Sequence, residues 1–107
     1  MSRGLKSTLA FAFVALAASP VLAARADVSH RISGCDWFLA EDATGFVLME
    51  WYGGNDPDKG ETLVGELHSY GMKTVFNLDS DSEVRAWIED FMLSKEDALE
   101  QLYEQCE

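Results

Sequence analysis

The chain has 107 residues, 48% of them hydrophobic, and a formal net charge of −11 at pH 7. All 19 acidic residues lie at or after Asp27, where only 5 basic residues remain, so this segment carries a net charge of −14. Such a surface repels phosphate backbones and anionic lipids, which excludes nucleic acid as an expected partner. It keeps a small protein soluble and monomeric, and it would attract a basic protein or peptide.

The N-terminus has the pattern of a secretory signal. Two basic residues precede an apolar run over 9–18, Pro20 ends that run, and small residues follow. This order predicts a signal peptide over residues 1–23, cleaved after Ala23, with cleavage after Ala26 as the alternative. Because the run is shorter than the ~20 apolar residues that a bilayer span needs, we expect no membrane insertion after cleavage. The mature protein is predicted to be periplasmic or secreted.

Two cysteines, Cys35 and Cys106, lie near opposite ends of the mature chain. An isolated pair in an exported protein predicts a disulfide bond. On the chain-entropy model this bond stabilises the fold by about 4 kcal/mol. Residues 32–35 also have the local pattern of a lipid-attachment motif. Charged residues separate them from the apolar run, so the disulfide is favoured.

After a polar lead-in over residues 24–34, residues 35–107 are predicted to form one domain. Gly45 and Gly71 mark turns between short segments that alternate or are rich in β-formers. Gly65, inside one of these segments, predicts a bulge or a sharp bend. The pattern predicts five strands, over residues 35–41, 46–52, 62–70, 73–78 and 84–90.

The last of these strands has a competing interpretation. Val84, Trp87, Ile88 and Phe91 also have the spacing of an apolar helix face. The next segment carries its own start signal, because Ser94 is a good N-cap for a helix over 94–105. Two helices joined without a glycine would be awkward, so we predict a strand followed by a helix.

Residues 50–54, 56–67 and 87–100 (EWYGG, DPDKGETLVGEL and WIEDFMLSKEDALE) resemble segments of small exported bacterial proteins of uncharacterised function with an SH3-like pattern. With the strand pattern, this resemblance predicts a mainly β (α+β) fold. The expected form is a small SH3-like, five-stranded, partly open barrel with one C-terminal α-helix. The resemblance implies no activity and assigns no role to any residue.

The acidic glycine-marked stretch over residues 53–66 invites comparison with a calcium loop. If Gly60 is the turn glycine, Glu66 falls at the twelfth position, but Pro57 and Lys59 occupy positions that need oxygen ligands. An EF-hand is therefore excluded. Three alternating acids are a weak alternative metal site, but the glycine that the turn of a calcium loop requires is absent. A solvated turn is the favoured interpretation of the segment that carries these acids. These acids are Asp79, Asp81 and Glu83. We predict no metal and no cofactor.

Catalytic motifs are not found in the sequence. His30 and His68 are far apart, and neither belongs to a nucleophile or metal motif. Pairs such as Glu50 with Glu66 or Glu89 could meet by chance among so many acids. We therefore expect no catalytic activity.

The leading hypothesis is a non-catalytic binding or interaction module. Glycine-marked turns should leave Tyr52 and Tyr70 exposed, and Asp56 and Asp58 lie in the longest loop, so these four are the candidate ligand-binding residues. The alternatives are a small hydrolase and an acidic antagonist of a basic envelope protein, similar in kind to lysozyme inhibitors.

Overall fold

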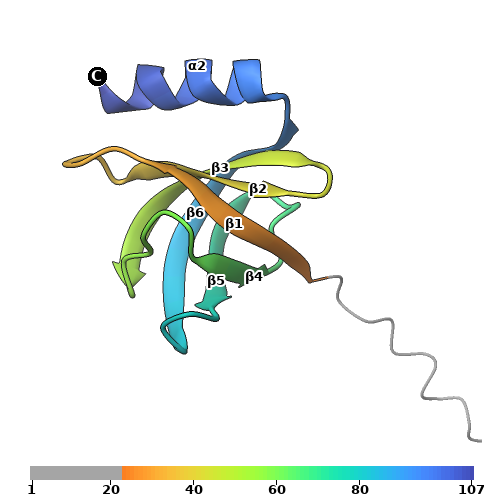
Figure 1. The fold of residues 1–107 in the computed structure, drawn as a ribbon, viewed down its shortest axis with the longest axis vertical. Coiled ribbons are helices and arrows are strands. Elements are labelled where there is room, and N and C mark those ends of the chain that lie inside the picture. Colours follow the sequence, from red (N-terminus) through yellow and green to blue (C-terminus); the bar gives the residue numbers. More distant parts are fainter. Residues whose placement is uncertain (1–22) are drawn as a thin grey trace, which may run out of the picture.

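The computed structural model describes residues 23–107, so most of the predicted signal peptide lies outside the described residues. Six antiparallel strands precede one helix, in the order β1 (Ala24–Arg31), β2 (Trp37–Asp42), β3 (Gly45–Gly54), β4 (Thr62–Gly65), β5 (Gly71–Asn77), β6 (Ser82–Leu93) and α2 (Lys95–Cys106). The strands close a barrel in the spatial order β1-β2-β3-β6-β5-β4 (Figure 1). No helix within residues 23–107 is long and apolar enough to span a membrane.

The prediction of a mainly β fold with a C-terminal helix is confirmed, but the strand count was wrong. The barrel has six strands instead of five, and it is closed instead of partly open. The additional strand is β1, which lies in the segment expected to be a polar lead-in. It pairs with β2 along one edge and β4 along the other, so it closes the sheet. Ala26 and Val28 point into the barrel and are buried, while Arg25 and Asp27 point outward.

The strand predicted over residues 84–90 is confirmed as part of β6, the longest strand of the barrel. Val84, Ala86 and Ile88 alternate inward and are fully buried, which a helix would not allow. The helix begins where its own cap predicts, because the Ser94 side chain accepts a hydrogen bond from the Asp97 N–H.

Inward-pointing side chains from all six strands fill the barrel. Gly65 lies where two strands approach closely. A Cβ built there would lie 2.7 Å from Cγ1 of Val75, so no larger residue fits unless Val75 moves. The core cluster consists of Ala26, Val28, Phe38, Ala40, Val47, Met49, Leu63, Leu67, Val75, Val84, Ala86 and Ile88.

A second apolar cluster lies outside the barrel, where α2 crosses β2 and β3 (Figure 1). Outward side chains of these strands pack against Ala98 and Leu102 of the helix, and the members are fully or almost fully buried. The predicted disulfide between Cys35 and Cys106 is confirmed, with 5.6 Å between the two Cα atoms. It fixes the end of α2 to the start of β2, and it occupies the sulfur that lipid attachment would need.

Candidate functional site

The outer surface of β3, β5 and β6 carries large apolar side chains that no other element within residues 23–107 covers. Trp87 of β6 is directly opposite Met72 of β5 on one side and Glu50 of β3 on the other. Directly opposite residues of antiparallel strands point to the same side of a sheet, so the three form one outward row. Tyr52 and Glu89 adjoin this row. We call these five residues the Trp87 face.

The apolar members of the Trp87 face are well exposed. The exposed fraction is 38% for Trp87, 39% for Met72 and 55% for Tyr52. These rings and the thioether contribute little to either buried cluster. Aromatic residues and methionine are enriched in protein–protein interfaces, and large exposed apolar groups that lie together indicate a contact surface.

Carboxylates order the aromatic groups of the Trp87 face. The Trp87 indole donates its Nε1–H to Glu89 Oε1 at 2.9 Å, which uses the ring's one donor and leaves its faces apolar. The negative charge of Glu50, and a hydrogen bond to it, raise the pKa of the Tyr52 phenol. An aromatic ring with two nearby carboxylates can attract a positively charged group.

The structure exposes both predicted tyrosines but does not bring the four predicted ligand-binding residues together. Tyr52 belongs to the Trp87 face. Tyr70 is 65% exposed and lies two residues before Met72, where it packs against Phe91 with 4.9 Å between the ring centroids. Tyr52 follows the outward row on β3, and Tyr70 lies directly before β5 begins at Gly71, so the two tyrosines lie diagonally across the row.

Asp56 and Asp58 lie in the loop at one end of the barrel, away from Tyr70. Asp56 forms a salt bridge with Arg31, with 2.8 Å between Nη2 and Oδ1. The backbone N–H of Asp58 donates to Glu61 Oε1 at 2.9 Å. These bonds order the loop, so its acidic residues have a structural role.

Asn77 is the residue that sequence reasoning missed in this loop. It is fully buried, and its Nδ2 donates to Asn55 Oδ1 at 2.8 Å and to Glu61 Oε1 at 2.9 Å. Its own Oδ1 accepts from the backbone N–H of Asp79. One amide thus ties the long loop to the turn after β5. No sequence pattern distinguishes such an asparagine from an exposed one.

The acids considered for metal binding are dispersed. Asp79 Oδ2 accepts from the backbone N–H of Thr62 at 2.7 Å, which holds β4 against the turn before β6. Within residues 23–107, no three or more His, Cys, Asp or Glu side chains are grouped so as to hold a metal ion. Glu66, considered as an acid/base partner of Glu50, lies 3.7 Å from the Lys73 ammonium instead.

His68 belongs to a small polar cluster at the other end of the barrel. Its Nε2 lies 2.6 Å from Asp42 Oδ2 and 3.4 Å from the Thr44 hydroxyl, and its ring stacks on Phe91. In a nucleophile–histidine–acid triad the hydroxyl and the acid contact different ring nitrogens. Here both face the same nitrogen, so the cluster lacks the geometry of a triad.

Asp42 organises this end of the barrel. Burial opposes its ionisation, but hydrogen bonds from Thr44 and His68 outweigh that effect and hold the pKa of the carboxyl below its ordinary value. Its Oδ1 accepts from the Thr44 backbone N–H at 2.8 Å and from the Thr44 hydroxyl at 2.7 Å. These bonds close the β2–β3 turn, so the cluster is explained by turn geometry.

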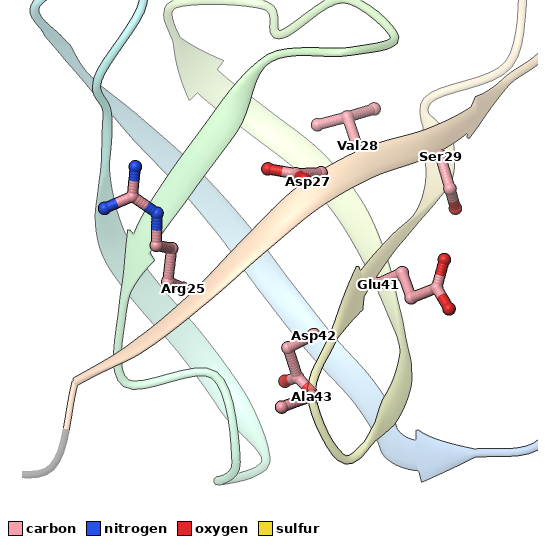
Figure 2. A pocket seen from close by; sticks show the side chains of 7 residues that line it. All are labelled: Arg25, Asp27, Val28, Ser29, Glu41, Asp42 and Ala43. Atoms are coloured by element: carbon pink, nitrogen blue, oxygen red, sulfur yellow. The ribbon is translucent and has the colours of Figure 1, made fainter.

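Two hollows adjoin the same end. One, of about 370 Å³, lies over β1 and β2, which supply most of its lining, with Ala43 from the turn that follows (Figure 2). Asp27 and Glu41 are directly opposite each other there, and Thr62 donates to the Asp27 carboxylate at 2.8 Å. The other, of about 410 Å³, is lined by Ala23, Ala24, Arg25, Asp42, Ala43, Thr44 and His68.

The chain has no significant match among protein-family models, curated proteins or solved structures.

Proposed function

We propose that the protein is a non-catalytic binding module of the bacterial envelope or the extracellular space, and that it binds another protein or a peptide through the Trp87 face. The observation that carries this proposal is the uncovered row of Met72, Trp87 and Glu50 across three strands. Tryptophan and tyrosine, which this face presents as Trp87 and Tyr52, are among the residues that dominate binding energy where they become buried against a partner.

The paired strands beneath the Trp87 face suit a binding surface. β6 is paired along both edges, the barrel is closed, and the disulfide fixes α2 to the start of β2. A surface built on paired strands changes shape little, so little conformational entropy is lost when a partner binds.

Affinity capture from an envelope extract tests this proposal, with the exported full chain carrying a C-terminal tag as bait. Trp87→Ala should remove the captured partner. The matched control is Tyr103→Ala on α2, an element that contributes no residue to the Trp87 face, where the ring is 57% exposed. Equal capture by both variants and the wild type, with unchanged denaturation midpoints, would contradict the proposal.

The second candidate is an acidic antagonist of a basic envelope protein. The net charge of −14 after Asp27 supports it. Charge-driven binding weakens steeply as salt rises above about 0.1 M, because the screening length then falls below about 10 Å. Capture that is unaffected by 0.5 M salt would argue against this candidate and leave the binding module in place.

A further inference from the structure

We infer that the Trp87 face recognises a lysine or arginine side chain of a basic protein partner, which lies on the Trp87 ring within reach of Glu50 and Glu89. This inference rests on the proposed function and adds the chemistry of the group that is bound.

The ring presents a face to such a cation. Trp87 is 38% exposed, and its Nε1–H is held by Glu89, so its edge is occupied while part of its face remains open. The tryptophan ring is the aromatic group that attracts lysine and arginine cations most strongly. Met72, directly opposite on β5, provides an apolar surface for the methylene groups of a long cationic side chain.

Two carboxylates lie beside the ring. Glu50 is directly opposite Trp87 on β3, where facing Cβ atoms lie about 5 Å apart. Glu89 is hydrogen-bonded to the indole itself. A cation on the ring would therefore meet negative charge from the neighbouring strand and from its own strand. Arg85 is the nearby positive group. It lies two residues from Trp87 and directly opposite Gly53, on the Tyr52 side of the row.

Charge selects this occupant over others. A second copy of the chain would bring another net charge of −14, and an anionic lipid surface would be repelled in the same way. A basic partner is attracted by the whole surface and then fixed by the ring and its two carboxylates.

The hollow over β1 and β2 is the rival site for a cation, since Asp27 and Glu41 are directly opposite there. It lacks an aromatic ring. Arg25 also lines it, and Thr62 already donates to Asp27. Its carboxylates are thus partly compensated within the chain, whereas the Trp87 face offers both charge and an apolar ring.

The test uses ¹⁵N-labelled exported protein titrated with N-acetyl-pentalysine amide, with pentaglutamate as the opposite-charge probe. The three indole N–H resonances are followed. Pentalysine should shift the Trp87 resonance. It should leave the resonance of Trp51 unchanged, because the Trp51 Nε1–H donates to the Asn55 carbonyl at 3.0 Å. Trp87→Leu assigns the resonance and keeps an apolar side chain, and it should weaken pentalysine binding about fivefold.

A charge-matched pair of double variants separates a defined site from diffuse attraction. Glu50→Gln with Glu89→Gln should weaken pentalysine binding about tenfold. Glu100→Gln with Glu104→Gln removes the same charge from the exposed side of α2 and should weaken it less than threefold. Equal losses in the two double variants would overturn the inference. A loss of pentalysine binding that occurs only in the double variant Asp27→Asn with Glu41→Gln would also overturn the inference. That result would place the cation in the hollow over β1 and β2.

Failure of this inference is distinguishable from failure of the proposed function. If Trp87→Ala abolishes capture of the partner but pentalysine shifts no indole resonance, the binding module stands and the cation site is overturned. If neither effect is found, both are overturned.

Discussion

Two outer faces of one barrel carry large apolar residues, and in the part of the chain that the structure describes α2 covers one of them and leaves the other exposed. Over β2 and β3, the outward side chains of Leu39, Phe46 and Leu48 are buried beneath α2. Over β5 and β6, Met72 and Trp87 occupy equivalent outward positions and remain more than a third exposed. The same alternation produces both faces, so alternation alone does not tell which apolar residues stabilise the fold and which remain available to a partner.

The tryptophans show the same contrast. Trp51 points inward, packs against the barrel core and donates its Nε1–H to a backbone carbonyl of the loop that follows. Trp87 points outward and donates its Nε1–H to the side-chain carboxylate of Glu89. Removing the first ring should therefore damage the core, while removing the second should change mainly the surface.

The largest expected effect is on the covered face. Replacing both cysteines, Cys35→Ser with Cys106→Ser, should lower the free energy of unfolding by about 4 kcal/mol, because a loop of 71 residues is no longer closed in the unfolded chain. Urea denaturation of the two proteins measures the difference. A loss below about 1 kcal/mol would show that packing alone holds α2 in place.

Both faces depend on closure of the barrel by β1. A chain that begins at Asp27 would lose the pairs that Ala24, Arg25 and Ala26 form with β4, together with the buried Ala26. We expect a chain beginning at Ala24 to be about 3 kcal/mol more stable than one beginning at Asp27. Cleavage after Ala23 is accordingly the predicted processing site. Intact-mass measurement of the exported protein checks it, and a mature chain starting at Asp27 would refute it.

A pair of truncations tests the contrast between the faces directly. Leu48→Ala should cost about 3 kcal/mol of unfolding free energy, because it leaves a cavity beneath α2. Trp87→Ala, although it removes a larger side chain, should cost about 1 kcal/mol, because the ring is partly exposed and leaves no enclosed cavity. Equal losses would mean that Trp87 serves the fold.

A pH-dependent effect is expected at Asp42, the last residue of β2 on the covered face. Its pKa is lowered in the folded protein, so the stability it contributes is present above the pKa of an unfolded carboxyl and is lost as the pH falls through the folded value. Asp42→Asn should cost about 1–2 kcal/mol at pH 6, and this difference should shrink below pH 4. A difference independent of pH would exclude the charge as its cause.

The sequence was sufficient for the class of fold, the disulfide and the terminal helix, since these depend on local alternation, a cysteine pair and a capping serine. It also indicated the exposure of Tyr52 and Tyr70 through neighbouring glycine turns. β1 was missed although Ala24, Ala26 and Val28 alternate with polar residues. The small side chains of Ala24 and Ala26 also suit a signal-peptide cleavage region, so the local pattern does not distinguish β1 from such a region.

Other features were beyond any local pattern. The exposure of Trp87 follows from where α2 lies, because the helix packs over β2, β3 and the end of β6 at Leu93 and leaves the middle of β6 uncovered. The burial of Asn77 follows from the long loop folding back over it. Both depend on contacts between segments far apart in the chain.

Oxidative footprinting of the methionines in the envelope extract is the most direct test of the Trp87 face. Met72 lies on the face and is 39% exposed, whereas Met92 is 59% exposed at the end of β6 and serves as the internal reference. We predict that the extract slows oxidation of Met72 at least threefold and leaves the rate at Met92 unchanged. Unchanged oxidation of Met72, or protection of Met92 alone, would contradict the assignment of this surface as the binding site.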